Sequence, residues 1–322
     1  MARHTVLVTR IIPEAGMGLV RAQCAARLWE EDRPMPRDVL LDRVKGVEGI
    51  LCLLTDRIDK ELMERAGPGL KVISTMAVGF DNIEVAEAAR RGIKVGNTPG
   101  VLTEAAADLT WALMLSLGRM IVEGDRMVRA GKFSGWSPTL LLGADFSGKT
   151  LGIVGMGRIG QAVAQRAQGF GMKIIYYDSR RLDPGAETAL GAQLVSLEKL
   201  IKNSDFVSLH CPLTKETFHL IGAREFSLMK PAAYLVNASR GPVVDEEALV
   251  EALRSKKIAG AGLDVYEHEP ELAAGLKDLD NVVLAPHLGS ASIETRNKMA
   301  EMAARNLLAG LKGEPLPFPV PG

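Results

Sequence analysis

The sequence is poor in cysteine and aromatic residues, and it carries no net charge. Its 322 residues include three cysteines, Cys24, Cys52 and Cys211, which are too few for a disulfide framework and form no cluster with zinc-ligand spacing. The 39 basic and 39 acidic side chains cancel, so no overall field attracts the protein to nucleic acid or to an anionic membrane. These features exclude a disulfide-rich secreted domain and indicate a cytoplasmic protein without a metal site that acts on a small molecule.

Long apolar runs are also missing. A bilayer-spanning helix needs roughly 20 consecutive apolar residues, whereas the most apolar helical stretch, 109–122, is interrupted by Ser116, Gly118 and Arg119. The N-terminal residues lead directly into an alternating stretch at 5–9, which is typical of a first strand and not of a signal peptide. We therefore expect neither membrane association nor an export signal.

Length and composition predict two α/β domains. A chain of 322 residues is long for one core, and 47% hydrophobic residues with 5% aromatics describe the aliphatic interior of parallel sheets covered by helices. Short β-branched runs alternate with helical patterns, as in βα units. The expected strands are 6–8, 49–52, 71–74 and 93–95 in a first series, and 151–154, 174–177, 206–209, 234–236 and 282–284 in a second. The expected helices are 59–66, 82–91, one long helix at 103–130 between the series, and a final helix at 293–311.

The clearest nucleotide-binding signal is the run Gly155-Met156-Gly157-Arg158-Ile159-Gly160, which fits Gly-x-Gly-x-x-Gly. The pattern alone is weak, because glycine-rich turns serve many loops. Here it follows the strand at 151–154, begins a helix and leads to a strand that ends at Asp178, 18 residues past Gly160. Glycines let the backbone approach a pyrophosphate, the helix start binds its charge, and Asp178 accepts hydrogen bonds from a ribose. The context predicts a dinucleotide-binding domain.

The residues after the second strand of this motif bear on the choice between NAD and NADP. A carboxylate at Asp178 repels the additional phosphate of NADP. Ser179 and Arg180 follow it and are expected to lie beside the cofactor. Arg180 and Arg181 are cations that either bind that phosphate or form a solvated surface pair. The sequence therefore favours NAD and leaves NADP as the alternative.

A second set of polar residues, Arg240, Glu269 and His287, follows later strands, where side chains converge on the crevice of a doubly wound sheet. Reducing a 2-oxo acid requires a cation for the carboxylate, an acid for the carbonyl oxygen and a partner that keeps the acid charged. Arginine offers a forked donor, histidine titrates near neutral pH, and a glutamate favours the imidazolium and fixes its tautomer. Each residue alone is better explained as a surface ion pair or a satisfied histidine. Together, behind a nucleotide motif, they predict an active site.

The other histidines lack an acidic or metal-ligand partner at a useful spacing in the sequence. His4, His210 and His219 are expected to lie outside the chemistry, with His210 bordering the cofactor. His268, next to Glu269, is expected to be a loop residue and not a second acid.

The sequence resembles the D-isomer-specific 2-hydroxyacid dehydrogenase family over nearly its whole length. The segments 155–160, 237–242, 262–270 and 286–290 match the family's motifs in order. Within the family it is most similar to glyoxylate and hydroxypyruvate reductases, through the segments 70–79, 96–103 and 306–315. The resemblance implies reduction of glyoxylate or hydroxypyruvate to glycolate or D-glycerate by hydride transfer from NAD(P)H.

The resemblance also implies the architecture. It predicts two doubly wound parallel-sheet domains of Rossmann and flavodoxin-like type with an active-site cleft between them. Residues 1–99 and 290–322 would form the substrate-binding domain and residues 100–289 the dinucleotide-binding Rossmann domain. The family's members imply a homodimer.

Individual site residues follow from the same match. Arg240, Glu269 and His287 match the catalytic triad, with Arg240 and His287 also contacting substrate. The loop that Ala77, Val78 and Gly79 match binds the substrate carboxylate through its backbone N–H groups. Leu53 and Trp136 match residues near the substrate, with Trp136 reaching across a dimer interface. The positions that match cofactor contacts are Thr103, Cys211, Pro212, Ala238, Ser239, Asp264 and Gly289.

Several features leave alternatives open. Asp178 stands where many glyoxylate reductases carry a small or hydroxyl residue, which puts an inherited NADP preference in doubt. Residues 131–136 resemble phosphite dehydrogenases, but Val78 replaces their substrate-loop lysine. A 3-phosphoglycerate dehydrogenase would usually carry a regulatory domain after the catalytic unit, and the sequence ends at Gly322. A nucleotide-sensing corepressor on the same fold is the alternative from another class, and turnover of NADH with glyoxylate would separate an enzyme from it.

Overall fold

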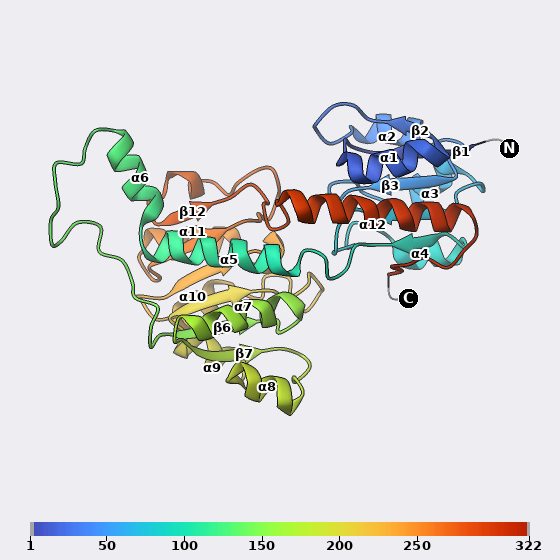
Figure 1. Ribbon diagram of the computed structural model, residues 1–322. Helices are drawn as coiled ribbons and strands as arrows, with labels where there is room; N and C mark the ends of the chain where they lie inside the picture. Colours follow the sequence, from blue (N-terminus) through green and yellow to red (C-terminus); the bar gives the residue numbers. More distant parts are fainter. Residues whose placement is uncertain (1–2, 321–322) are drawn as a thin grey trace. The chain divides into compact units, whose positions relative to one another are not determined.

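The computed structural model describes residues 3–320. The chain forms two compact units: Met1–Leu102 with Ala291–Gly322, and Thr103–Ser290. Each unit contains one parallel β-sheet covered by helices on both faces, and Figure 1 shows the two units. The expected fold class of two parallel-sheet α/β domains is confirmed.

The first unit has a five-stranded sheet in the order β2-β1-β3-β4-β5, in which every pair of neighbours is parallel. Its strands are β1 His4–Val8, β2 Cys24–Leu28, β3 Gly49–Cys52, β4 Val72–Thr75 and β5 Lys94–Gly96. Its helices are α1 Glu14–Gln23, α2 Arg37–Arg43, α3 Lys60–Ala66, α4 Val85–Arg90 and, from the end of the chain, α12 Ile293–Leu311. Strands β3 and β4 are buried along their whole length, including the polar Ser74 and Thr75 at the end of β4.

Helix α12 is an integral part of the first unit, where it packs against α1 and the β3–β4 face of the sheet (Figure 1). Ser292 precedes it, and the Ser292 side chain caps it by accepting the Thr295 N–H at 3.1 Å. Gly16 of α1 lies so close to it that a Cβ there would be 2.3 Å from the carbonyl oxygen of Ala300. The hydroxyl of Ser74 donates to the carbonyl of Ala303 at 2.8 Å, which ties β4 to the same helix.

The second unit has a seven-stranded parallel sheet in the order β12-β11-β10-β9-β6-β7-β8. Its strands are β6 Thr150–Val154, β7 Lys173–Tyr177, β8 Ala192–Leu194, β9 Phe206–Leu209, β10 Tyr234–Asn237, β11 Gly260–Leu263 and β12 Val282–Leu284. Its helices are α5 Thr103–Gly118, α6 Ile121–Arg129, α7 Arg158–Gly169, α8 Pro184–Leu190, α9 Leu197–Asn203, α10 Ala223–Leu228 and α11 Glu246–Arg254. The strand order reverses between β6 and β9, and open α/β sheets bind ligands outside the carboxyl ends of the strands at such a point.

The expected single helix at 103–130 is wrong. The chain bends by 64° between α5 and α6, and Met120 at the break adopts a left-handed conformation with φ of 53°. The carbonyl of Gly118 accepts the Ala144 N–H at 2.7 Å, so a bond to the returning chain replaces the next helical one. The predicted helix 82–91 is likewise shorter in the structure, at Val85–Arg90.

Within residues 3–320, no single helix is long and apolar enough to cross a membrane, and only the bent pair α5 and α6 reaches that length and composition together. In the same residues, no group of three or more His, Cys, Asp or Glu side chains is arranged to hold a metal ion.

Candidate active site

The glycine-rich loop joins β6 to α7 in the second unit, and its three glycines serve different purposes. Gly155 has φ of 92°, and a Cβ there would lie 2.5 Å from the backbone nitrogen of Cys211. A Cβ on Gly160 would lie 2.2 Å from the carbonyl oxygen of Gly155. Gly157 has an ordinary φ of −71°, and a Cβ there would have nothing within 4 Å. Packing therefore requires two of the glycines, whereas the third leaves the backbone open to a ligand at the start of α7.

Asp178 follows β7 and fastens the end of that strand to the glycine-rich loop. Its Oδ2 accepts the Met156 N–H at 2.7 Å, and its Oδ1 accepts the Arg180 N–H at 3.0 Å and the Ser179 hydroxyl at 3.3 Å. The carboxylate thus lies beside the loop, where an adenosine ribose is expected in this fold. The residues therefore fit a dinucleotide.

The two arginines after Asp178 differ in their surroundings. Arg181 is held by Glu187 of α8, with Nη2 2.8 Å from Oε2 and Nε 3.1 Å from Oε1. The hydroxyl of Tyr176 donates to the same carboxylate at 2.5 Å. Arg180 is exposed, and its guanidinium makes no hydrogen bond or ion pair with the described residues. Of the pair, Arg180 is the cation available to a ligand.

His287 and Glu269 form the central polar contact of the site, in the loops that follow β12 and β11. His287 follows β12, and its Nδ1 lies 3.0 Å from Oε2 of Glu269, which follows β11. The second carboxylate oxygen, Oε1, accepts the Tyr266 N–H at 3.1 Å. When Nδ1 donates to Glu269, Nε2 remains as the ring nitrogen that can exchange a proton with a ligand. Both side chains are 30% exposed, so a ligand can reach them.

The electrostatics keep Glu269 ionised. Burial would raise its pKa, but the hydrogen bond from His287, the charge of His287, the Tyr266 N–H and the charge of Arg240 together lower it. A carboxylate at this position accepts a hydrogen bond from Nδ1–H of His287 and so fixes the tautomer and orientation of the ring. This is the arrangement that a histidine general acid needs.

Asp264 holds the loop that carries His287 by hydrogen bonds to its backbone. This residue, immediately after β11, is 1% exposed, and its two oxygens accept the Leu288 N–H at 2.6 Å and the Gly289 N–H at 2.8 Å. Its carbonyl also accepts the N–H of His287 at 2.9 Å, and His287 adopts a left-handed conformation with φ of 56°. Burial raises the pKa of Asp264, while the two loop N–H groups and the charge of His287 oppose that shift. The carboxylate therefore positions the His287 loop, whatever contact it makes with a cofactor.

Arg240 follows β10, in a loop organised by Asn237. The Asn237 side chain donates to the Arg240 carbonyl at 2.9 Å and accepts the Ser239 N–H and hydroxyl at 3.0 and 2.8 Å. A Cβ on Gly241 would lie 1.8 Å from the carbonyl oxygen of Tyr266, so the loops after β10 and β11 are in direct contact. Asn237 lies in a motif that the sequence revealed, but its role in shaping the loop becomes visible only in the structure.

In the first unit, the loops after β3 and β4 lie at the same edge of the sheet, because these strands are parallel neighbours. The carbonyls of Ala77 and Val78 accept bonds from the Thr98 N–H at 2.9 Å and the Asn97 side chain at 2.7 Å. The N–H groups at 77–79 make no hydrogen bond within the described residues, so they are available to an anion. Leu53, after β3, donates its N–H to the buried carboxylate of Asp56 at 2.8 Å, a partner that the sequence did not suggest.

The remaining predicted residues lie in several places. Thr103 begins α5, Cys211 and Pro212 follow β9, and Ala238 follows β10. Trp136 is not brought to the strand ends of its unit. Its side chain is 85% exposed, and it lies in the segment after α6, which Figure 1 shows extending away from the sheet of the second unit.

Two of the three histidines that have no acidic partner at a useful spacing in the sequence acquire one in the structure. His4 lies 2.9 Å from Glu48, and His219 lies 2.7 Å from Glu267; both partners are distant in sequence. His210 is partly buried, with Nδ1 inside the protein and Nε2 2.8 Å from the Ser208 hydroxyl, and burial lowers its pKa to about 4.

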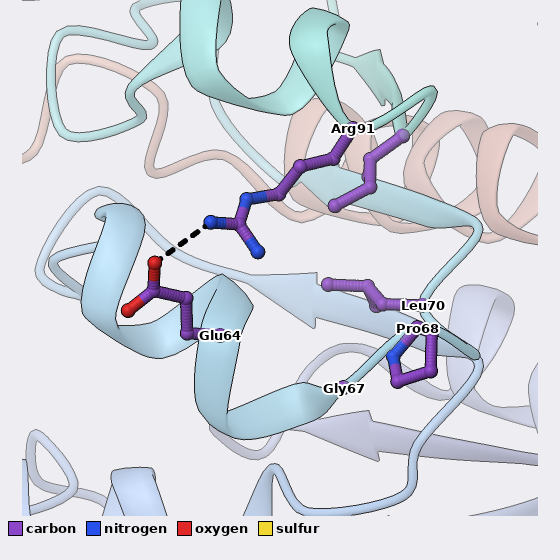
Figure 2. A pocket seen from close by; sticks show the side chains of 6 residues that line it. Glu64, Gly67, Pro68, Leu70 and Arg91 are labelled. Atoms are coloured by element: carbon purple, nitrogen blue, oxygen red, sulfur yellow. Dashed lines mark hydrogen bonds and ion pairs between the residues drawn. The ribbon is translucent and has the colours of Figure 1, made fainter.

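A shallow cavity of about 380 Å³ lies elsewhere, on the first unit (Figure 2). Its lining residues are Glu64, Gly67, Pro68, Leu70, Arg91 and Ile93. The Arg91 guanidinium bonds to Glu64 across it at 2.9 Å. Leu70 and Ile93 precede β4 and β5, so the cavity is at the edge of the sheet opposite the loop at 77–79. It holds none of the predicted site residues and no convergent chemistry.

Comparison with known proteins places this geometry in a family. Residues 111–289 match the family described as D-isomer specific 2-hydroxyacid dehydrogenase, NAD binding domain. The chain is 55% identical over 313 residues to a glyoxylate reductase of Thermococcus litoralis, covering 96% of this chain and 94% of that protein. A glyoxylate reductase from Paecilomyes thermophila has a similar crystal structure, with a TM-score of 0.88, 36% identity and coverage of 100% and 99%.

A third similar protein was crystallised with ligands. It is an NADPH-dependent glyoxylate/hydroxypyruvate reductase from Sinorhizobium meliloti, in complex with NADP and malonate, with a TM-score of 0.87 and 33% identity over 99% of this chain and 97% of that one. Sequence, fold and the order of the site motifs agree. The chain belongs to the D-isomer-specific 2-hydroxyacid dehydrogenase family.

Proposed function

We propose that this protein reduces glyoxylate and hydroxypyruvate to glycolate and D-glycerate with NAD(P)H. The observation that carries the proposal is the His287–Glu269 hydrogen bond, which lies in the same unit as an open glycine-rich loop. The glyoxylate reductases to which the chain is similar support the substrate class.

The proposed roles follow from the chemistry of each group. NAD(P)H, when bound, supplies the hydride to the carbonyl carbon of the substrate. His287 Nε2 donates a proton to the carbonyl oxygen, and Glu269 holds the ring in position through Nδ1 while it does so. Arg240 donates to the carboxylate and carbonyl of the 2-oxo acid through its forked guanidinium. The N–H groups at 77–79 bind the same carboxylate, which makes the first unit the substrate-binding domain and the second the dinucleotide-binding domain.

The cofactor is proposed to be NADH in preference to NADPH. Asp178 supports this, because its carboxylate would accept bonds from a ribose hydroxyl and repel a phosphate there. At about 4 Å and an effective dielectric near 20, that repulsion is about 4 kcal/mol before relaxation and screening reduce it. The engagement of Arg181 by Glu187 also supports it, since only Arg180 is left to attract the phosphate. We expect NADH to be preferred about ten- to a thousandfold in catalytic efficiency, which equals roughly 1.4 to 4 kcal/mol.

The substitution that tests the preference is Asp178→Ser. It should improve the use of NADPH and weaken that of NADH, measured as kcat/KM for each cofactor at saturating glyoxylate. Equal or better use of NADPH by the wild-type protein would contradict the proposed role of Asp178 and point to Arg180.

A second copy of the chain is proposed to cover the segment around α6. Helix α6 buries none of its residues within the described chain, and the segment exposes five large apolar side chains: Ile121, Val128, Phe133, Trp136 and Leu142, at 52 to 85%. Large apolar side chains exposed along one segment in this way are typical of a surface that another protein covers. We expect sedimentation to show a dimer that the substitution Trp136→Glu weakens.

The three buried free cysteines support the proposal that the protein works in a reducing compartment such as the cytoplasm.

The experiment that tests the function is a substrate panel with the purified protein and both cofactors. Glyoxylate and hydroxypyruvate should be reduced faster than 3-phosphohydroxypyruvate or longer 2-oxo acids, and phosphite should not reduce NAD. NADH binding without turnover of any 2-oxo acid would instead indicate a nucleotide-sensing module.

A further inference from the structure

A buried glutamate holds both ends of the loop that carries Glu269. Glu246, the first residue of α11, is 4% exposed. Its Oε1 accepts the N–H of Glu267 at 2.6 Å, and its Oε2 accepts the N–H of Ala273 at 3.2 Å. These two N–H groups lie on either side of Glu269. One carboxylate therefore spans the segment in which the partner of His287 is found.

The helix itself does not require this glutamate. Asp245 already caps α11 by accepting the Ala248 N–H at 2.9 Å, and Glu247 supplies a second acidic residue in the first turn. Burial raises the pKa of Glu246, the charge of Glu267 adds to that shift, and the two loop N–H groups and the charge of His268 oppose it. A buried carboxylate is costly unless its bonds compensate. The bonds that compensate here are those to the Glu269 loop.

The contact is reciprocal and extends to a third segment. Glu267 accepts the N–H of Glu246 through Oε2 at 3.4 Å, while its Oε1 lies 2.7 Å from Nε2 of His219. The N–H of His219 donates to the carbonyl of Pro242 at 2.8 Å, so His219 is also bound to the loop that contains Arg240. Glu246 is thus the centre of a set of bonds that joins the loop after β10 to the loop after β11.

We propose that Glu246 is a positioning residue for the reaction: by binding the Glu267 and Ala273 N–H groups it holds Glu269 where its carboxylate meets Nδ1 of His287. The inference rests on the proposed function, because Glu269 acts on the substrate only through His287. Glu246 itself touches neither His287 nor a ligand in this scheme.

The first test compares Glu246→Gln with Glu247→Gln. Both remove one charge from the same helical turn, but Glu247 is exposed and holds no loop. The side-chain amide introduced by Glu246→Gln would present a donor to one of the two N–H groups, so the loop should shift. Because a displacement of about 1 Å can cost 100-fold in rate, we expect kcat to fall about 10- to 100-fold for E246Q and to stay within about twofold for E247Q. The dissociation constant for NADH should stay near wild type in both.

The pH profile distinguishes positioning from a general loss of structure. The charged groups that face Glu269 are His287, Arg240 and Asp264, and those that face Glu246 are Glu267 and His268. A displaced Glu269 favours the imidazolium less, so the decline of kcat with rising pH should begin at lower pH in E246Q. An unchanged profile with a reduced kcat would overturn the proposal.

A double-mutant cycle is decisive. If Glu246 acts through Glu269, E246Q should lower kcat by less than about twofold in a Glu269→Gln background. An equal fall in both backgrounds would show a merely structural role. Wild-type turnover by E269Q and His287→Ala would refute the proposed function instead.

If E246Q does not fold, Glu246→Asp provides a second test. Aspartate keeps the charge but is too short to reach both N–H groups, so we expect faster amide hydrogen exchange at 267–273 alone. Unchanged exchange in that segment would overturn the proposal.

Discussion

The three glycines of the nucleotide loop predict opposite outcomes for two similar substitutions. Gly157→Ala adds a methyl group that meets no protein atom within 4 Å, at a residue with φ of −71°. Alanine caps a helix less well than glycine, but it also restricts the unfolded chain, and each effect is worth about 0.5 to 1 kcal/mol with opposite sign. We therefore expect the melting temperature of the cofactor-free protein to change by less than about 2 °C.

The same methyl group would stand where the backbone is open to the pyrophosphate. Displacing the phosphates would weaken one charge-assisted hydrogen bond from the helix start, worth about 1.5 to 3 kcal/mol. The dissociation constant for NADH, measured by fluorescence titration or calorimetry, should rise about 10- to 150-fold. Wild-type affinity in G157A would refute the assignment of this loop to the cofactor.

Gly160→Ala is the matched control. Its Cβ would lie 2.2 Å from the carbonyl oxygen of Gly155, which is backbone and cannot turn aside. We expect a loss of about 1 to 3 kcal/mol or more in the free energy of unfolding, which thermal unfolding without cofactor would show. A G160A protein as stable as wild type would contradict the packing described for the loop.

Three further predictions concern single residues. His287→Ala should leave NADH binding nearly intact and lower kcat by about 10²- to 10⁴-fold, as for other general acids; wild-type turnover would remove His287 from the mechanism. Arg240→Lys should lower kcat/KM for glyoxylate by about 10- to 150-fold, since an ammonium cannot replace a planar fork and one charged hydrogen bond is worth about 1.5 to 3 kcal/mol; efficiency near wild type would exclude a forked contact. The pKa of His210 falls from 6.5 to about 4 on burial, so its charging favours the unfolded chain as pH drops through that interval. In urea unfolding, the free energy of unfolding of the wild-type protein should therefore fall by up to about 3 kcal/mol between these pH values, and that of His210→Gln should not show this fall. Identical pH dependence of the two proteins would contradict the burial of this ring.

The sequence predicted most strands because they are short, buried and rich in β-branched residues. It missed β2, β8 and β11, whose sequences Cys-Ala-Ala-Arg-Leu, Ala-Gln-Leu and Gly-Ala-Gly-Leu have few such residues. Their positions depend on pairing with neighbouring strands and not on local preference. The break between α5 and α6 was missed for a similar reason, since a bond from the distant Ala144 ends α5.

The site residues also divide into those that sequence patterns predict and those that depend on contacts between distant segments. The pairing of His287 with Glu269 was predicted from the chemistry that a histidine acid needs, although β11, the strand that Glu269 follows, was missed. Glu246 offered no signal, because an acidic residue at the start of a helix is ordinary and its partner Glu267 lies 21 residues away. The contact between His219 and Glu267 spans 48 residues and is equally invisible in a local pattern.

The order in which the chain is made gives α12 a further importance. Ribosomal synthesis completes the second unit at Ser290, whereas the first unit still lacks the helix that covers β3 and β4. Because domains generally fold as units during synthesis, the unit made second can be finished first, and the unit begun at the N-terminus must wait with an apolar face uncovered. Nascent chains stalled shortly after residue 290 should therefore offer chaperones a binding surface on the first unit that disappears once Leu311 has been added.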